Sequence, residues 1–352
     1  MKNRPLKKRT ITQRDVAQAA GVSQETVSQI LRGVGRFSDD TRQRVNDTAR
    51  ELGYRHNMLA RAVRQGRTCT IALLTTPQDG ISFLPHEMLK AIEVYLSDND
   101  QFLSICALPP GYPDNLTRVP AALGTITADG MLINITHGIS PELHGHIARH
   151  APPAVWLNAK LDSNCVYPDD CGAFADATVY LHSHGVPVVS YVDCLPNDRQ
   201  LIPNGHYSET DRRAGYLQGA ASVGMTPTLL AVDDLNTETL RQLVASAPGG
   251  RAALLCYERN EALRAMLVGL EAGLSLPEQL IIAYPSERAF YDPQLDSILR
   301  HIPIPEAEVA EAALRSLNRR IQQPDNDAPA TGVPYPRAIL PTLLDRSLHY
   351  AR

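Results

Sequence analysis

The sequence predicts two structural parts, an all-α helix-turn-helix head and a larger α/β core of two lobes. Three observations predict them. Short segments with helical apolar spacing fill the first 56 residues, strand-like and helix-like segments alternate from residue 69 onward, and the charge balance changes sign between the two parts. A chain of 352 residues is long enough for two or three domains of about 100–200 residues each.

The two parts differ sharply in charge. Residues 1–68 contain 15 lysines and arginines against 6 aspartates and glutamates, whereas the rest of the chain contains 19 against 32. A basic head on an acidic body is typical of a nucleic-acid-binding domain joined to a domain with another task. A basic solubilising tail is disfavoured because this head carries well-patterned helices.

The head begins with a helix-start signal. Thr12 is a good N-cap, and Asp15 three residues later completes a pattern like a capping box. Gly21 can adopt the left-handed conformation that closes a short turn between two helices, and Val22 is expected to fill the space there. The apolar residues between cap and turn recur at helical spacing: Val16, Ala17 and Ala20.

Two more helices follow the turn. Ser23 and Ser38 are their expected N-caps, and Gly53 ends the third helix. Three short helices with a glycine turn between the first two match the helix-turn-helix plan, although a generic three-helix fragment could share the apolar pattern. The expected inward residues are Val27, Ile30 and Leu31 in the second helix and Val45, Ala49 and Leu52 in the third.

The outer face of the second helix is short and polar. Side chains of this kind can bond base edges or phosphates of DNA. The polar positions on this face are Gln24, Glu25, Thr26, Ser28 and Gln29.

The literal residues of the head carry a family resemblance. The stretch T-x-x-D-V-A-x-x-A-G-V-S-x-x-T-V-S at residues 12–28 closely resembles the DNA-binding domain of the lactose/galactose repressor (LacI/GalR) family. The resemblance continues through S-x-x-T-R-x-R-V at residues 38–45 and ends with N-x-x-A-R-x-V-R-x-G-R-T at residues 57–68. It implies a helix-turn-helix domain over residues 1–56, followed by a hinge over residues 57–68 that becomes helical on DNA and enters the minor groove.

The resemblance implies roles for individual residues of this head. Gln24, Glu25 and Gln29 fall at base-reading positions. Many relatives carry arginine at the position of Gln29, and because glutamine pairs best with adenine and arginine with guanine, we expect an altered half-site. Val63 falls at an apolar wedge position that relatives more often fill with leucine, so we expect less DNA bending. The other expected DNA contacts are Thr12, Arg14, Ser23, Thr26, Ser28, Arg36, Asn57 and Ala60.

From residue 70 the pattern changes to apolar strand-like runs with amphipathic helices between them. Such alternation predicts a parallel sheet wound on both faces, and about 250 residues or more is too much for one sheet, so we expect two lobes. The expected helices cover residues 87–96, 174–184, 238–245 and 261–272, and residues 324–336 read as a proline-rich loop. The expected strands cover residues 70–74, 102–107, 130–135, 154–157, 186–192, 228–232, 252–256 and 279–283.

The core resembles the effector-binding core of the same family, which is akin to periplasmic sugar-binding proteins. Matching stretches include A-D-G-M-L-I at residues 128–133, R-x-x-G-Y at residues 212–216 and L-P-x-L-L-D-R-S at residues 340–347. The resemblance implies a two-lobed, periplasmic-binding-protein-like core over residues 69–352. Such a core binds a small effector and forms a homodimer, whose two heads meet a pseudo-palindromic double-stranded DNA operator.

Five core residues are candidates for effector binding. Arg212 matches the family pattern, and Asn158 takes the place of a common ligand aspartate. Glu258 and Arg259 stand where sugar-responsive relatives carry an Asn-Asp pair. Phe83 lies where relatives place an aromatic ring over the ligand, although core packing is an equal alternative.

A further departure is Pro285, where relatives carry a ligand aspartate if one deleted residue is allowed. Carboxylates and amides bind sugar hydroxyls in fixed directions, so proline and arginine in their place weaken a standard sugar site. Two arginines and a glutamate suit an anionic or phosphorylated ligand. Three possibilities stay open: an unusual small ligand, a sugar, or no ligand at all, with Glu258 and Arg259 forming only a surface ion pair.

The remaining candidate groups predict no further chemistry. Six scattered cysteines lack metal spacing and are expected to be free thiols. Trp156 is expected in the core or the cleft wall. We expect no cofactor, no metal and no enzyme, since the P-loop, G-x-S-x-G and H-E-x-x-H motifs do not occur. A loose histidine cluster is expected to be solvated on a helix: His137, His144, His146 and His150.

The sequence contains no run of 18 apolar residues, and its basic N-terminus lacks the apolar stretch of a secretion signal, so we expect a cytoplasmic protein with no membrane span. The leading hypothesis is a homodimeric DNA-binding transcription regulator, more a repressor than an activator, which a cleft ligand controls. Two rivals stay open: a ligand-independent architectural DNA-binding protein with a degenerate pocket, and an enzyme acting in the cleft.

Overall fold

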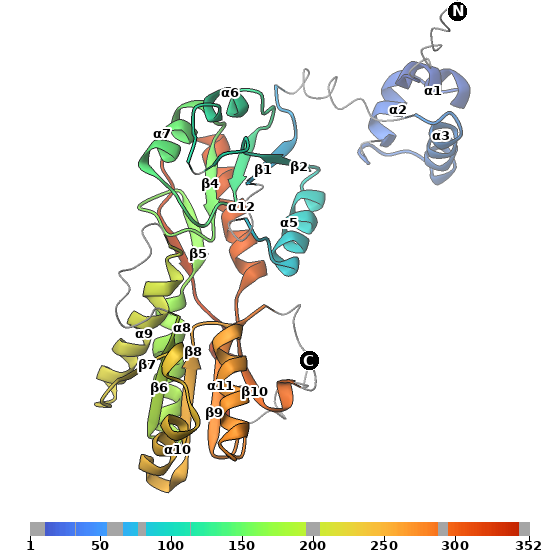
Figure 1. Cartoon of the computed structure of the whole chain (residues 1–352). Helices are drawn as coiled ribbons and strands as arrows, with labels where there is room; N and C mark the ends of the chain where they lie inside the picture. The colour runs from blue at the N-terminus through green and yellow to red at the C-terminus, as the bar shows by residue number, and fades with distance from the viewer. Residues whose placement is uncertain are drawn as a thin grey trace, which may run out of the picture. The chain divides into compact units, whose positions relative to one another are not determined.

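In the computed structural model the chain divides into two compact units, residues 1–68 and residues 69–352 (Figure 1). Within them it describes residues 11–31, 33–54, 66–76, 82–112, 114–194, 205–287 and 295–344.

The described residues of the first unit form three helices, α1 (Gln13–Ala20), α2 (Gln24–Leu31) and α3 (Asp39–Glu51). Thr12 caps α1 in a capping box: the Asp15 N–H donates to Thr12 Oγ1, and the Thr12 N–H donates to the Asp15 carboxylate. Gly21 closes the turn in the left-handed conformation at φ +68°. The predicted helix-turn-helix is confirmed.

The core of the head is small and apolar. Tyr54 and Phe37 pack against it. Leu52, predicted to face inward, is 37% exposed, and that prediction is wrong. The reason is that α3 ends at Glu51 and the chain turns at Gly53, which brings Tyr54 rather than Leu52 onto the core. The buried residues are Val16, Ala17, Ala20, Val27, Ile30, Val45 and Ala49.

The second unit contains two lobes, each built on a parallel sheet with helices on both faces. The sheet of the first lobe has strand order β11-β5-β4-β3-β1-β2. Helices α5 (His86–Asp98) and α12 (Glu306–Gln322) cover one face, and α6 (Val119–Leu123) and α7 (Pro141–His150) cover the other. Its strands are β1 (Thr70–Thr75), β2 (Phe102–Ala107), β3 (Gly130–Ile133), β4 (Ala154–Leu157), β5 (Cys165–Pro168) and β11 (Thr331–Val333).

The sheet of the second lobe has strand order β10-β9-β8-β6-β7. Helices α8 (Asp170–Ser183) and α9 (Ser208–Ser222) cover one face, and α10 (Thr237–Ser246) and α11 (Arg259–Glu271) cover the other. Its strands are β6 (Val188–Asp193), β7 (Thr228–Ala231), β8 (Ala252–Cys256), β9 (Leu280–Ser286) and β10 (Leu299–Pro303). Short 3-10 turns lie at η1 (Val232–Asp234), η2 (Pro248–Gly250), η4 (Leu295–Ser297) and η5 (Arg337–Leu343).

The chain passes between the lobes after β5, after β10 and after β11 (Figure 1). The carboxyl ends of the inner strands of both sheets therefore meet where the lobes face each other. In open parallel sheets, ligands bind outside the carboxyl ends of the strands. The fold thus places the loops that follow β4, β8 and β9 around one position.

The eight predicted strands all exist within a few residues of their predicted bounds, and the two-lobed α/β core is confirmed. Three strands escaped prediction. β5 is short and ends in proline, and β10 buries Arg300 and His301, which breaks the apolar run that marks a strand. β11 lies inside residues 324–336, which were predicted as a loop only; its pairing with β5 decides its structure.

The contact between α8 and α9 depends on glycine. A Cβ on Gly215 would overlap the backbone carbonyl of Cys171 on α8, and a Cβ on Gly219 would lie 2.8 Å from the carbonyl oxygen of Ala175. Any larger residue would push the two helices apart, because backbone atoms rather than flexible side chains stand in the way.

We predict that Gly215→Ala lowers the free energy of unfolding of the core by about 1–3 kcal/mol or more, through overpacking against backbone. Urea unfolding followed by circular dichroism measures this change. The matched control is Gly145→Ala on α7, where an added Cβ meets only the flexible side chain of Arg149. That exchange should stabilise by roughly 0.5–1 kcal/mol, because alanine favours a helix interior more than glycine does. Equal stability of both variants would contradict the close packing.

Candidate functional site

The residues predicted to read DNA bases lie on α2. The Thr26 N–H donates to Ser23 Oγ at 3.0 Å, so Ser23 caps the helix as predicted. The two hydroxyls are also 2.9 Å apart and share a hydrogen bond. A capped helix start of this kind places oriented N–H groups and hydroxyls where a phosphate can approach.

Two of the predicted base-reading side chains are joined to each other. Gln29 Nε2 donates to Glu25 Oε1 at 3.0 Å, one helical turn away. A primary amide that gives one N–H in this way retains a second N–H and a carbonyl oxygen. One donor beside one acceptor is the pattern that complements adenine in the major groove. Gln24, at the first position of the same helix, is exposed.

The other predicted DNA contacts lie in different parts of the head. Thr12 is occupied by its capping box with Asp15. Arg14 on α1 and Arg36 between α2 and α3 are exposed. Ser28 lies on α2, and three predicted contacts lie outside the described residues: Asn57, Ala60 and Val63.

The core contains a cavity of about 490 Å³ where the two lobes face each other. Residues of both lobes line it. The five residues predicted to bind an effector are all among them: Phe83, Asn158, Arg212, Glu258 and Arg259. Lining residues that the sequence reading did not select include Thr136, His137, Asp170, His206, Ser208, Tyr257, Tyr284, Ser286, Glu287 and Glu306.

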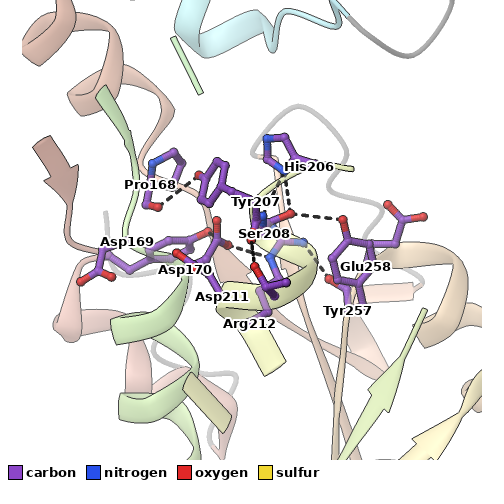
Figure 2. A network of polar contacts seen from close by, with 12 residues as sticks. Pro168, Asp169, Asp170, His206, Tyr207, Ser208, Asp211, Arg212, Tyr257 and Glu258 are labelled. Carbon is purple, nitrogen blue, oxygen red and sulfur yellow. Dashed lines mark hydrogen bonds and ion pairs between the residues drawn. The ribbon is translucent and has the colours of Figure 1, made fainter. Parts of the chain in front are cut away.

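The polar network in Figure 2 includes an ion pair between Arg212 and Asp170. Arg212 Nε donates to Asp170 Oδ1 at 2.6 Å, and Arg212 Nη1 donates to the carbonyl oxygen of Tyr257 at 2.8 Å. Tyr335 donates its hydroxyl to the same Asp170 oxygen at 3.0 Å. Burial by itself would lower the pKa of Arg212, but the carboxylate of Asp170 outweighs burial and raises it. The arginine is therefore charged, and its charge is compensated within the protein.

A chain of hydrogen bonds fixes the neighbouring polar groups. Burial lowers the pKa of His206 to about 4, so the imidazole is neutral near pH 7. Its Nε2 lies 3.0 Å from the carbonyl oxygen of Asn158 and must donate, which leaves Nδ1 to accept from Ser208 Oγ at 2.7 Å. Ser208, having donated, accepts from the hydroxyl of Tyr257 at 3.1 Å. The order of donors is thus determined along the chain (Figure 2).

Three further contacts, besides that of His206 with Asn158, tie the first lobe to the start of α9 in the second. Tyr207 shares its hydroxyl hydrogen between Asn158 Oδ1 at 3.3 Å and the carbonyl oxygen of Pro168 at 3.2 Å. Lys160 Nζ lies 2.6 Å from Asp211 Oδ2. Asn158, held at φ +52°, therefore uses its side-chain oxygen as a bridge between the lobes.

The end of β9 corrects one expectation from the sequence. Pro285 does stand where an aspartate was expected, but the next two residues, Ser286 and Glu287, both line the cavity. Burial raises the pKa of Glu287 to about 7. The loss of polar groups at this strand end is therefore compensated by its neighbours. The signal was available in the sequence as a Ser-Glu pair directly after the proline.

Other residues singled out from the sequence also find their places. Phe83 is 55% exposed, so the alternative that it packs in the core is wrong. Trp156 is buried in the core of the first lobe and does not line the cavity. His144, His146 and His150 lie on α7 as expected, but His137 does not: it precedes the helix and faces the cavity, 5.4 Å from His206 between ring centroids.

Two general features of the described residues bear on function. No group of three or more histidine, cysteine or acidic side chains is arranged to hold a metal ion in the part of the chain that the structure describes. Within that same part, every helix is too short or too polar to cross a membrane.

The head and the whole chain both have known relatives. The family described as "Bacterial regulatory proteins, lacI family" matches residues 12–57. The HTH-type transcriptional repressor CytR of Escherichia coli (strain K12) is 28% identical over 322 residues, covering 88% of this chain and 90% of that protein. Catabolite control protein A of Staphylococcus epidermidis is 24% identical over 343 residues, covering 93% and 97%.

The fold is shared with solved structures. The Lac repressor dimer bound to operator and the anti-inducer ONPF superimposes with a TM-score of 0.63 at 17% identity, covering 93% of this chain and 97% of that one. The transcriptional regulator CelR in complex with cellobiose gives a TM-score of 0.55 at 20% identity, covering 92% and 97%.

We predict that Asp170→Asn lowers the free energy of unfolding of the core by about 3–5 kcal/mol, because it leaves the charge of Arg212 buried and uncompensated. Urea unfolding at pH 7 measures the loss. The double variant Asp170→Asn/Arg212→Met should recover most of it, since it removes the buried charge as well. A single-variant loss below about 1 kcal/mol, the range of exposed pairs, would show that water solvates the guanidinium.

Proposed function

We propose that this chain belongs to the LacI family of bacterial regulatory proteins and is a sequence-specific DNA-binding transcription regulator. A small ligand in the core cavity would control its operator affinity. Repression is the proposed output. The observation that carries the proposal is the capped α2 helix within a matched lacI-family segment, with Gln24, Glu25 and Gln29 on its polar face. The regulator would bind its operator in the cytoplasm.

A ligand in the cavity would touch both lobes. Phe83 and His137 come from the first lobe, and Tyr257 and Glu287 come from the second. A compound that contacts all of them binds one relative position of the lobes better than others, and so it shifts the population toward that position. We propose that this shift is transmitted through residues 57–68 to the two heads.

The alternative is a regulator that binds DNA without sensing anything. One observation disfavours it: the cavity is lined by Ser286 and Glu287, whose Oγ and Oε2 are buried and have no hydrogen-bond partner among the described residues. Burying polar atoms costs free energy unless they are bonded, so a pocket without a ligand would not be expected to retain unpartnered oxygens of this kind. The relatives are transcription regulators, and the proposal includes no catalytic step.

Exposed apolar side chains support a homodimer through the core. Ile105 on the edge strand β2 is 66% exposed, and Leu267 on α11 is 63% exposed. Three other large apolar side chains are also exposed: Val94, Phe102 and Leu270. In the view of Figure 1, α5 and α11 lie on the same side of the core. A second copy related by a two-fold axis would cover the patches on both lobes at once.

The proposal predicts a definite DNA site. Selection from a random DNA pool with the full chain should yield a pseudo-palindrome, and Gln29→Arg should change the preferred base from adenine to guanine at one position of each half-site. Discrimination there should amount to about 1–3 kcal/mol. Gln18→Arg, on the exposed side of α1, adds the same charge away from α2 and should leave the motif unchanged. An identical motif for wild type and Gln29→Arg would refute the placement of α2 in the major groove.

The dimer face has its own test. We predict that Ile105→Glu/Leu267→Glu is monomeric in analytical ultracentrifugation, because each copy would bury two carboxylates against apolar side chains. Its operator affinity should fall by about 10²-fold or more, since one head no longer brings the second to its half-site. Ala148→Glu/Ala221→Glu places the same charges on the exposed faces of α7 and α9 and should stay dimeric. A dimeric first variant would place the interface elsewhere.

A further inference from the structure

The charge of the cavity differs from the expectation raised by its two arginines. Asp170 already compensates Arg212 within the protein. Among the other lining residues, Glu258, Glu287 and Glu306 are acidic and Arg259 is basic. The lining therefore carries more carboxyl groups than cations, and an incoming phosphate or carboxylate would meet groups of its own sign.

The strand end of β9 offers acceptors to a ligand. Ser286 is 5% exposed, and within the described ranges its Oγ has no hydrogen-bond partner. Glu287 Oε2 is likewise buried and has no partner among the described residues. Both residues line the cavity. A buried oxygen that accepts no hydrogen bond costs free energy. A ligand whose N–H groups donate to these two oxygens would remove that cost and bind more tightly.

Aromatic rings line the same cavity. Phe83, Tyr257 and Tyr284 come from three different segments. Arg212 already lies over the ring of Tyr257, 5.0 Å from its centroid, and Tyr284 is buried, whereas Phe83 is 55% exposed and is the ring most open to a ligand among these three. Ring faces attract cations, and carboxyl groups beside ring faces form an environment that suits an ammonium group. The rings, the acidic balance and the unpartnered oxygens all favour the same ligand chemistry.

We infer that the effector carries a protonated amine, which binds at Ser286 and Glu287, and that phosphorylated and carboxylated compounds are excluded from the cavity. The inference rests on the proposed ligand-dependent function and specifies its ligand class. It replaces the anionic ligand that the two arginines had suggested.

The affinity for an ammonium ligand should depend on pH. Burial holds the pKa of Glu287 at about 7, so this carboxyl group is partly protonated near neutral pH. An ammonium ligand favours the ionised form, and its affinity should therefore rise from pH 6 to pH 8. His137 and His206 face the cavity too, and burial lowers the pKa of both; for His206 it lowers the pKa to about 4, so that imidazole is neutral over this range. The remaining charged lining groups are Asp170, Arg212, Glu258, Arg259 and Glu306.

The experiment compares compounds matched in size and different in charge. The full chain, with its selected operator, is titrated with putrescine, 1,4-butanediol and succinate, and with glucosamine, glucose and glucose 6-phosphate. Calorimetry measures binding, and fluorescence anisotropy of labelled operator measures release or tightening. We expect the ammonium compound of at least one set to bind tighter than its neutral and anionic partners. The rise in affinity from pH 6 to pH 8 is expected for putrescine, whose amines stay protonated over this range.

A variant locates the site. Glu287→Gln keeps the shape and one acceptor but removes the charge, and we expect it to weaken ammonium binding by about tenfold or more and to abolish the rise with pH. The matched control is Glu238→Gln on the exposed face of α10, which should leave ligand binding unchanged.

The possible failures can be told apart. Preferred binding of glucose 6-phosphate or succinate, or unaltered ammonium binding in Glu287→Gln, would overturn the amine inference and leave the proposed ligand-dependent regulator standing. If no compound of any charge binds while the operator is still selected, both the inference and the ligand half of the proposed function fail.

Discussion

The structure of the core depends on one buried ion pair. Asp170 stands at the first position of α8, directly after the chain crosses from the first lobe, and Arg212 reaches it from α9 at 2.6 Å. Tyr335, which follows the crossing after β11, donates to the same carboxylate oxygen. Because a buried charge must be paired and hydrogen-bonded, this contact fixes two crossings relative to the α8–α9 layer. The position of the cavity follows from it.

The same pair decides the chemistry of the cavity. By compensating Arg212 it removes one of two cations that a sequence reading would offer to an anion. The hydrogen-bond chain from Tyr257 through Ser208 to His206 then determines which neighbouring groups donate and which accept. What remains open to a ligand is set by the carboxyl groups, the aromatic rings and the end of β9. The character of the site is thus a property of the network more than of any single residue.

Much of the fold could be predicted because its signals are local. The capping box at Thr12 and Asp15 and the left-handed Gly21 depend on residues a few positions apart. Long apolar runs marked most strands of both sheets. Prediction failed for β10, where Arg300 and His301 are buried inside a strand, and for β11, whose structure comes from pairing with a strand far away in sequence. A signal carried by a distant partner is not visible in a local window.

The sequence by itself determined the head, the alternation that makes a two-lobed core, and five residues that line its cavity. Only the tertiary structure decided that Asp170 pairs with Arg212, 42 positions away, and that Ser286 and Glu287 reach the cavity beyond Pro285. The physical reason is packing. Helix caps and turns depend on residues a few positions apart in the sequence. The pairing of two buried charges depends instead on the close approach of α8 and α9, and Gly215 permits that approach.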